Sequence, residues 1–118
     1  MSKRTILIYG LHPIQQLALV SSAEKEGISC RIVADTETAY TVDQLLSGKQ
    51  LPPRPALPVA GRYALLDGFD GDEDVALNLI NAAAPGVIKA VHTKHNGSWH
   101  FFKLCSAIQE ENDYIRKK

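Results

Sequence analysis

Apolar positions in this chain form short runs and helical repeats that alternate along its length. Four short runs, rich in β-branched residues, predict strands at residues 5–9, 28–33, 63–66 and 87–91. Apolar residues spaced three or four apart predict helices at residues 13–26, 42–46, 73–84 and 99–115. This alternation predicts one α/β domain over residues 1–118, with three layers around a mainly parallel four-stranded sheet. Right-handed crossovers and the unbroken first run favour strand order 2-1-3-4, with helices on both faces.

The starts of the predicted helices carry residues that favour helix initiation. Pro13 suits a first helical position, and Thr41 with Gln44 forms a capping box. The first helix, residues 13–26, has an apolar face that we expect to pack on the sheet. That face comprises Ile14, Leu17, Ala18 and Ser21, widened by Leu19 and Val20. No stretch of sequence recurs visibly, so we expect a domain without internal repeats.

One segment, residues 48–61, shows neither a helical nor a strand period and holds four of the six prolines. Proline cannot donate a backbone hydrogen bond, so this segment predicts an extended surface loop inside the domain. Residues 49–55 (KQLPPRP) also match the pattern of a polyproline ligand, although a stiff loop is the simpler interpretation.

The charges of the chain exclude two classes of partner. Thirteen basic and 13 acidic residues give a formal net charge of +0, so we expect neither nucleic acid nor an anionic membrane as a partner.

No apolar run approaches the roughly 18 residues of a membrane span. The first run is too short for a signal peptide, so we expect a cytoplasmic protein. Cys30 and Cys105 lie among apolar neighbours, and we expect two buried free thiols in a reducing compartment.

The turn after the last strand is the clearest candidate for a binding site. Thr93, Asn96 and Trp99 lie three residues apart, just before or at the start of the last helix. The free N–H groups of a helix N-terminus attract anions and polar ligands, and Trp99 would add an apolar wall. The alternative is structural, with Thr93 and Asn96 bonding the turn backbone and Trp99 packing at the domain edge.

Four further residues would join this site if the strands are parallel. Gly10 and His12 follow the first strand, while Asp67 and Gly68 follow the third. The carboxyl ends of parallel strands meet at one end of a sheet, where α/β proteins usually bind ligands. The predicted ligand or partner site therefore comprises Gly10, His12, Asp67, Gly68, Thr93, Asn96 and Trp99.

Two sets of residues resemble those used in metal-dependent chemistry. His92, His95 and His100 could hold zinc or nickel if the turn brings them together. No Cys–Cys or His–Glu pattern accompanies them, so we predict no metal and no cofactor. Asp67 and Thr93 resemble the phosphoacceptor and switch hydroxyl of a response-regulator receiver. However, the first strand is not followed by the acidic pair that a receiver needs to hold magnesium.

The stretches ALLDGFDGDED and IKAVHTKHNGSW together resemble an uncharacterised bacterial family of small proteins with a domain of unknown function. The matching features are a Gly-Phe pair after a strand, here Gly68 and Phe69, and a Thr-x-x-Asn-x-x-Trp signature. Thr93, Asn96 and Trp99 supply that signature. The likeness covers nearly the whole chain. It implies an α/β architecture with a glycine turn after the first strand, and it implies no activity.

We favour a non-enzymatic binding or regulatory α/β domain, capable of self-association and with an unknown partner. No Ser–His–Asp or Cys–His–Asn set can be assembled from the sequence. The alternative is a small enzyme, or one subunit of an enzyme, that acts on a small polar or anionic ligand at the same site. Its polar groups would be His12, Asp67, Thr93 and His95.

Overall fold

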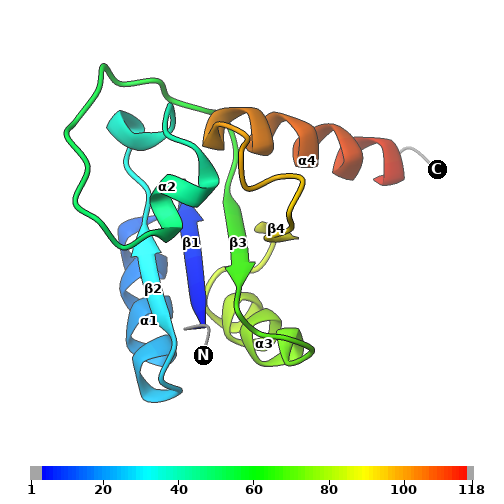
Figure 1. Cartoon of the computed structure of the whole chain (residues 1–118). Coiled ribbons are helices and arrows are strands. Elements are labelled where there is room, and N and C mark those ends of the chain that lie inside the picture. Colours follow the sequence, from blue (N-terminus) through cyan, green and yellow to red (C-terminus); the bar gives the residue numbers. More distant parts are fainter. Residues whose placement is uncertain (1–3, 117–118) are drawn as a thin grey trace.

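The computed structural model describes residues 4–116, and every predicted strand and helix is present in this part of the chain (Figure 1). The strands are β1 (Thr5–Tyr9), β2 (Ser29–Ile32), β3 (Tyr63–Asp67) and β4 (Ile88–Val91). The helices are α1 (Pro13–Lys25), α2 (Val42–Leu46), α3 (Glu73–Ala83) and α4 (Phe101–Arg116), with a 3₁₀ turn, η1 (Asp35–Glu37), before α2. Predicted boundaries lie within two residues of the observed ones, because caps and breakers are local signals. No helix in residues 4–116 is long and apolar enough to cross a membrane.

The strand order β2-β1-β3-β4 confirms the predicted order, but the prediction of a mainly parallel sheet is wrong. β1 pairs with β2, and β3 with β4, in parallel. The central pair, β1 and β3, is antiparallel, with Thr5 opposite Asp67 and Tyr9 opposite Tyr63. The carboxyl ends of β1 and β2 therefore lie at one end of the sheet, and those of β3 and β4 lie at the opposite end.

The direction of β3 follows from the path of the chain after β2. Helix α2 first carries the chain back over the sheet, so that Leu46 and Gly48 share a hollow with Thr5 at the start of β1. The proline-rich segment, residues 48–61, then returns to the other end of the sheet (Figure 1). There the N–H of Val59 donates a hydrogen bond to the Tyr9 hydroxyl at 2.9 Å. An extended segment of this length, at about 3 Å per residue, easily spans a five-residue strand. The segment thus crosses the length of the sheet a second time, and β3 therefore runs antiparallel to β1.

The fold consists of two halves with the same order of elements, so the expectation of no internal repeat is wrong. Residues 4–46 form β1-α1-β2-α2, and residues 62–105 form β3-α3-β4 and the start of α4. Backbone hydrogen bonds recur at equivalent places. Ser29 N to Arg4 O (3.0 Å) matches Ile88 N to Arg62 O (3.0 Å), and Val33 N to Ile8 O (2.8 Å) matches His92 N to Leu66 O (2.8 Å). Glycines with positive φ recur too, Gly10 (φ 82°) with Gly68 (φ 80°) and Gly27 (φ 70°) with Gly86 (φ 89°).

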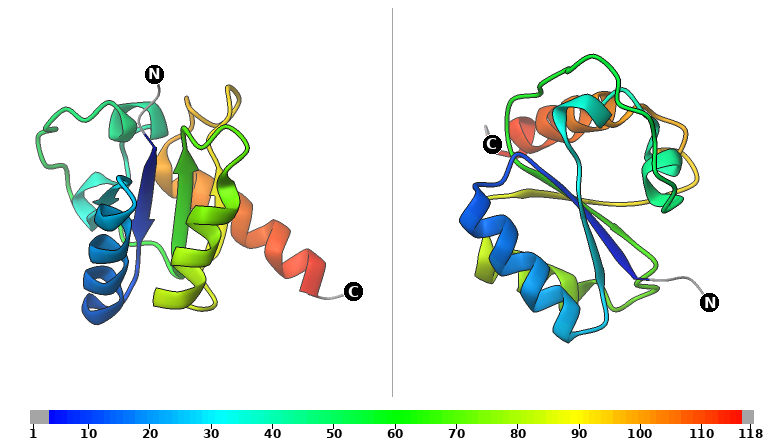
Figure 2. Two further views of the ribbon diagram at one scale, coloured as in Figure 1. Left: turned by 90° about the horizontal axis from the view of Figure 1, so that it is seen from below. Right: turned by 90° about the vertical axis from the view of Figure 1, so that its left-hand side faces the viewer.

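The two halves meet around an approximate two-fold axis at the centre of the β1–β3 pair. On one face of the sheet α1 and α3 pack over a core that includes Ile6, Ile8 and Leu66 (Figure 2). On the other face, the segments before α2 and α4 bind each other. Thr41 and His100 form an antiparallel bridge, Val42 N donates to Trp99 O at 2.9 Å, and Phe101 N donates to Tyr40 O at 2.8 Å. These two hydrogen bonds are equivalent under the two-fold axis.

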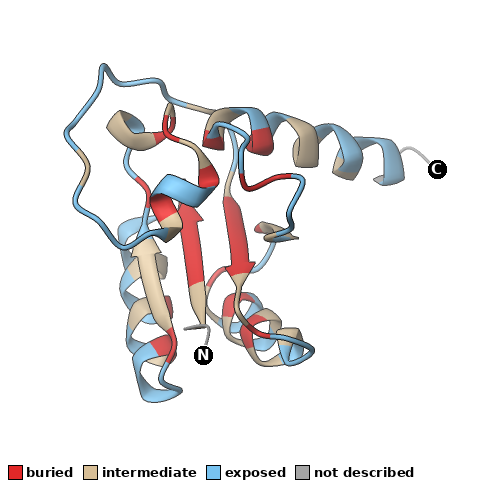
Figure 3. Cartoon of the chain, viewed as in Figure 1, coloured by how far each residue is buried: buried red, intermediate tan, exposed pale blue. Residues whose placement is uncertain are grey.

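Helix α1 presents a different face to the sheet from the predicted one. Leu19 and Ala23 are buried, whereas Ile14 and Leu17 are 73% and 70% exposed. Ala18 and Ser21 are exposed as well, and α1 is exposed along its outer side (Figure 3). Residues 13–23 contain no charged residue. Hydrophobic spacing alone therefore could not distinguish the stripe that is buried from the stripe that faces water.

Candidate functional site

The residues of the predicted site lie at two opposite ends of the sheet. Gly10 and His12 follow β1, at the end where Tyr9 pairs with Tyr63. Asp67 lies four residues further along β3, about 13 Å away at the usual rise of a strand. Gly68 follows Asp67 at the same end of the sheet. Thr93, Asn96 and Trp99 also lie at this end, because they follow β4 and β4 is parallel to β3. The structure therefore separates His12 from Asp67 and removes the shared site on which the enzyme hypothesis was built.

Gly10 and His12 have local structural roles at their end of the sheet. His12 is the N-cap of α1, where its Nδ1 accepts a hydrogen bond from Ile14 N at 3.3 Å. Gln15 Oε1 accepts from His12 N at 3.3 Å and completes a capping box. Gly10 has φ 82°, and a Cβ there would overlap the carbonyl oxygen of Gly61. Both residues are thus accounted for by the turn between β1 and α1.

Thr93 and Asn96 hold the turn after β4 together. Asn96 Oδ1 accepts from Thr93 N at 2.9 Å, and Asn96 N donates to Thr93 Oγ1 at 3.2 Å. Asn96 Nδ2 also donates to Val91 O at 3.0 Å. The first half has an equivalent bond, in which Glu37 Oε1 accepts from Ala34 N at 3.0 Å. These bonds support the structural interpretation of Thr93 and Asn96, while Trp99 stays 36% exposed.

A polar network that the sequence did not reveal lies at the carboxyl ends of β3 and β4. His92 Nδ1 lies 2.9 Å from Asp67 Oδ1, and His92 Nε2 lies 2.9 Å from Asp43 Oδ1. Asp43 comes from the first turn of α2, so the imidazole links α2 to the sheet. Both carboxylates can accept a hydrogen bond only from an imidazole that carries a proton on each nitrogen. The sequence indicates His92 only as a candidate metal ligand, and no local pattern connects it with Asp43, which lies 49 residues away.

The opposite end of the sheet, where β1 and β2 finish, carries different side chains at the equivalent positions. Matching backbone hydrogen bonds identify the equivalents of Asp67, His92 and Asp43 as Tyr9, Val33 and Phe102. There the Tyr9 hydroxyl is hydrogen-bonded to Asp35 and Val59 N, and Val33 and Phe102 are apolar, so no imidazole joins two carboxylates at this place in the described chain. The network is therefore not a requirement of the architecture. It borders a hollow of ≈ 540 Å³ lined by Asp43, His92, Thr93 and Lys94, and one of ≈ 300 Å³ that includes Asp67, Gly68 and Asp70.

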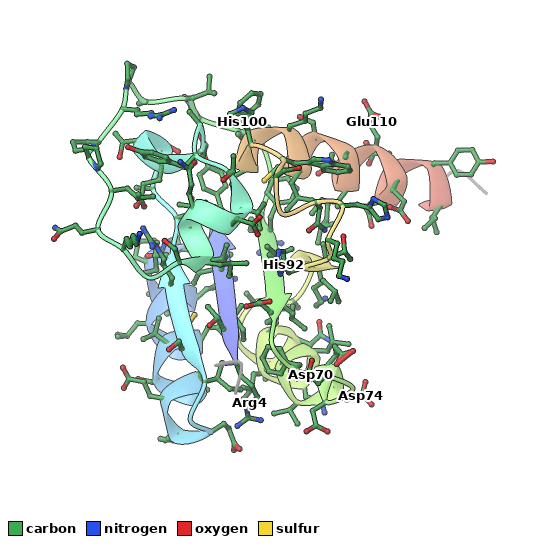
Figure 4. The ribbon with its side chains drawn as sticks, viewed as in Figure 1. Arg4, Asp70, Asp74, His92, His100 and Glu110 are labelled. Atoms are coloured by element: carbon green, nitrogen blue, oxygen red, sulfur yellow. The ribbon has the colours of Figure 1, made fainter. Side chains whose placement is uncertain are left out.

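The three histidines do not converge. His92 and His100 lie on different parts of the molecule, at the end of β4 and the start of α4 (Figure 4). His100 Nδ1 lies 2.6 Å from Ala39 O, and its ring stacks on Phe102 at 5.8 Å. His95 is exposed in the turn between them. Within residues 4–116, no three His, Cys, Asp or Glu side chains are arranged to hold a metal ion.

The two cysteines are free thiols with suppressed reactivity. Cys105 is fully buried and Cys30 is partly buried. Burial raises the pKa of Cys30 to about 11 and that of Cys105 to about 12, well above the usual value of 9.0. Thiolate, the nucleophilic form, is therefore scarce at neutral pH. Neither cysteine is suited to nucleophilic catalysis.

A groove of ≈ 650 Å³ runs between the outer side of β4 and helix α4. Its lining includes Val91, Trp99, Ala107, Ile108 and Ile115, and within the described chain Lys89 and Glu111 are its charged members. Val91 is 48% exposed and Ile115 is 64% exposed. The groove therefore presents apolar side chains to solvent next to Trp99.

The β2 side of the first half has an equivalent hollow of ≈ 750 Å³, but its lining differs. It holds three charged residues, Arg31, Glu24 and Asp67, beside apolar ones such as Leu45 and Leu46, and Arg31 pairs with Glu37 at 2.8 Å. Helix α2 has five residues, whereas α4 has 16 and extends along the whole groove. The long covering helix thus distinguishes the second half.

Comparison of the chain with protein-family models, with curated proteins and with solved structures finds no match in any of the three. The resemblance to a bacterial family with a domain of unknown function therefore stays a prediction from the sequence.

Proposed function

We propose that this protein is a non-enzymatic binding domain that contacts a protein partner through the groove between β4 and α4. The observation that carries the proposal is the exposed apolar lining around Trp99, Val91 and Ile115. Exposed apolar surface rimmed by polar residues is typical of protein interaction sites. Tryptophan is also among the residues that most often dominate the binding energy of such sites.

The polar groups at the carboxyl ends of β3 and β4 support binding better than catalysis. Both ring nitrogens of His92 already face carboxylates, so neither is free to exchange a proton with a substrate. The hydrogen-bonding groups of Asn96 are largely used within its own turn. The start of α2 holds the backbone that carries Trp99, because Asp43 N donates to Gly97 O and Val42 N donates to Trp99 O, both at 2.9 Å.

Site-specific photo-crosslinking tests this proposal. A benzophenone amino acid replaces Trp99 in the groove or, as a matched control, the exposed apolar Leu17 on α1. Irradiation in the cells that make the protein should give a discrete covalent adduct from position 99 and none from position 17. No adduct from position 99, or equal adducts from both positions, would show that the groove is not the binding surface.

A further inference from the structure

Helix α4 is longer than the fold requires. Its first turns bury Phe101, Leu104 and Cys105 in the core, as the short α2 does with Val42 and Leu45. Beyond this point α4 continues past β4, away from the sheet (Figure 1). At about 1.5 Å per residue, the 16-residue helix is roughly 24 Å long. Its last turn therefore carries Ile115, 64% exposed, at the far end of the groove.

The outer side of β4 is protected against the addition of another strand. In the described chain β4 pairs with β3 on one side, and its odd-numbered residues point their backbone groups outwards. Two of these outward carbonyls already have partners. Lys89 Nζ donates to Val87 O at 3.1 Å, and Asn96 Nδ2 donates to Val91 O at 3.0 Å. A short edge strand with a central lysine is a common defence against strand pairing. An occupant of the groove must therefore dock through side chains.

The two charged residues of the groove complement each other across its width. Lys89 lies on the β4 wall and Glu111 on the α4 wall. Among residues 4–116, the structure places no ion pair between them. A two-fold axis beside β4 would bring Lys89 of one copy to Glu111 of the other, and the reverse contact would form at the same time. A surface with one base and one acid on facing walls is thus complementary to itself.

From these observations, and resting on the proposed function of the groove, we infer that its occupant is a second copy of this chain. In this dimer the projecting end of each α4, with Ile115, docks in the groove of the other copy beside Trp99. Lys89 and Glu111 form two symmetric ion pairs between the copies. Thirteen residues line the groove, fewer than the roughly 20–30 per side of a standard interface, so a transient, reversible dimer is expected.

A charge-swap experiment on the full chain tests the dimer. Sedimentation equilibrium should show a reversible dimer for the natural sequence. Lys89→Glu or Glu111→Lys alone should weaken dimerisation about tenfold or more, because each creates two like-charge contacts. The combined variant should return to within about threefold of the natural chain. Lys103→Glu, an exposed position of α4 outside the groove, makes the same charge change and should have no effect.

Three results would overturn the inference. These are a chain that stays monomeric at every concentration, a combined variant that fails to recover, or a dimer that survives the swaps but is lost in Leu17→Glu on α1. The crosslinking experiment separates this failure from that of the proposed function. An adduct of position 99 with a different protein would reject the second copy while retaining the binding groove, whereas no adduct would reject both.

Discussion

The two ends of the central sheet are completed in different ways. Where β1 and β2 finish, Tyr9, Val33 and Phe102 occupy the positions that Asp67, His92 and Asp43 occupy where β3 and β4 finish. The first set is aromatic and aliphatic, with the Tyr9 hydroxyl hydrogen-bonded to Asp35 and Val59 N, whereas the second is a chain of charge-assisted hydrogen bonds centred on His92. Because the backbone hydrogen bonds are the same, the architecture needs only side chains of suitable size there. The polar set joins Asp67 and His92 of the second half to Asp43 of the first and lies at one end of the sheet, whereas the long α4 belongs to the second half alone.

The difference shows which features belong to the fold and which to function. Features present in both halves include the glycine turns, the parallel strand pairs and the helix packed behind each pair. They would be needed whatever the protein does. Features of one half are not needed by the other. Each half thus serves as a control for the other.

The largest effect is expected where the halves meet. Phe101 and Val42 are equivalent, 1% and 0% exposed, and Phe101 packs edge-on against Tyr9 at 5.9 Å. Phe101→Ala should lower the free energy of unfolding by about 3–5 kcal/mol and Val42→Ala by about 2 kcal/mol, since the larger side chain leaves the larger cavity. Urea denaturation measures both. A larger loss for Val42→Ala would mean that the two positions are not equivalent.

A second prediction concerns Gly97, whose equivalent in the first half is Thr38, since Asp43 N donates to Gly97 O as Phe102 N donates to Thr38 O. Thr38 is fully buried and donates from Oγ1 to Leu57 O at 2.6 Å. A Cβ at Gly97 would come within 2.8 Å of the Asp43 carboxylate carbon. Gly97→Ala should therefore displace Asp43 from His92 and cost about 2 kcal/mol of stability.

The same substitution in an Asp43→Ala background should cost less than about 1 kcal/mol, because the obstructing carboxylate is gone. Equal costs in the two backgrounds, measured by urea denaturation, would show that Gly97 is needed for a reason other than Asp43.

The polar network itself should contribute less, since its members are partly exposed. His92→Val copies the first half and leaves Asp67 and Asp43 without their shared partner, at a cost of about 1 kcal/mol. Adding Asp67→Leu should recover most of this loss, because both members of the more buried pair are then apolar. Thermal denaturation of the single and double variants measures the two losses of stability. A double variant less stable than His92→Val would mean that the fold does require a carboxylate there.

The smallest expected effect lies at the helix starts. His12 caps α1 through its side chain, whereas Asp72, the N-cap of α3, makes no such bond. His12→Ala should cost about 0.5–1 kcal/mol. Asp72→Ala should cost less than about 0.5 kcal/mol, from the loss of a charge at the helix end. A reversed order, measured by urea denaturation, would contradict the observed capping geometry.

Local features of the fold were predictable from sequence, and long-range ones were not. Thr41 and Gln44 start α2 as the capping box requires, with Gln44 N donating to Thr41 Oγ1 at 3.2 Å. Asp43, in the same box, binds His92 across 49 residues, and no local pattern reports such a contact. The direction of β3 was mispredicted for a similar reason, because it depends on where the proline-rich segment attaches to Tyr9.

The internal repeat did leave a weak signal in the sequence. The stretch ILIYGL, ending at Leu11, corresponds to ALLDGF, ending at Phe69, and each ends in a glycine with positive φ followed by a residue that is 5% exposed. Apart from such positions the halves differ, because burial constrains size and polarity more than identity. The paired glycines carry this signal, since Gly68 lies 58 residues after Gly10 and Gly86 lies 59 residues after Gly27.

The proline-rich segment is the covalent link between two units that otherwise associate without bonds. Each unit holds a complete β-α-β-α sequence, and the β1–β3 pair and the Thr41–His100 bridge join them. If the chain is cut between Pro53 and Arg54, fragment complementation is expected, with two separately made polypeptides reassembling into the native fold. Circular dichroism of the mixture against the separate fragments would measure it. Reassembly would show that the two units form an interface like that of an obligate heterodimer, with the proline-rich segment as a linker between them.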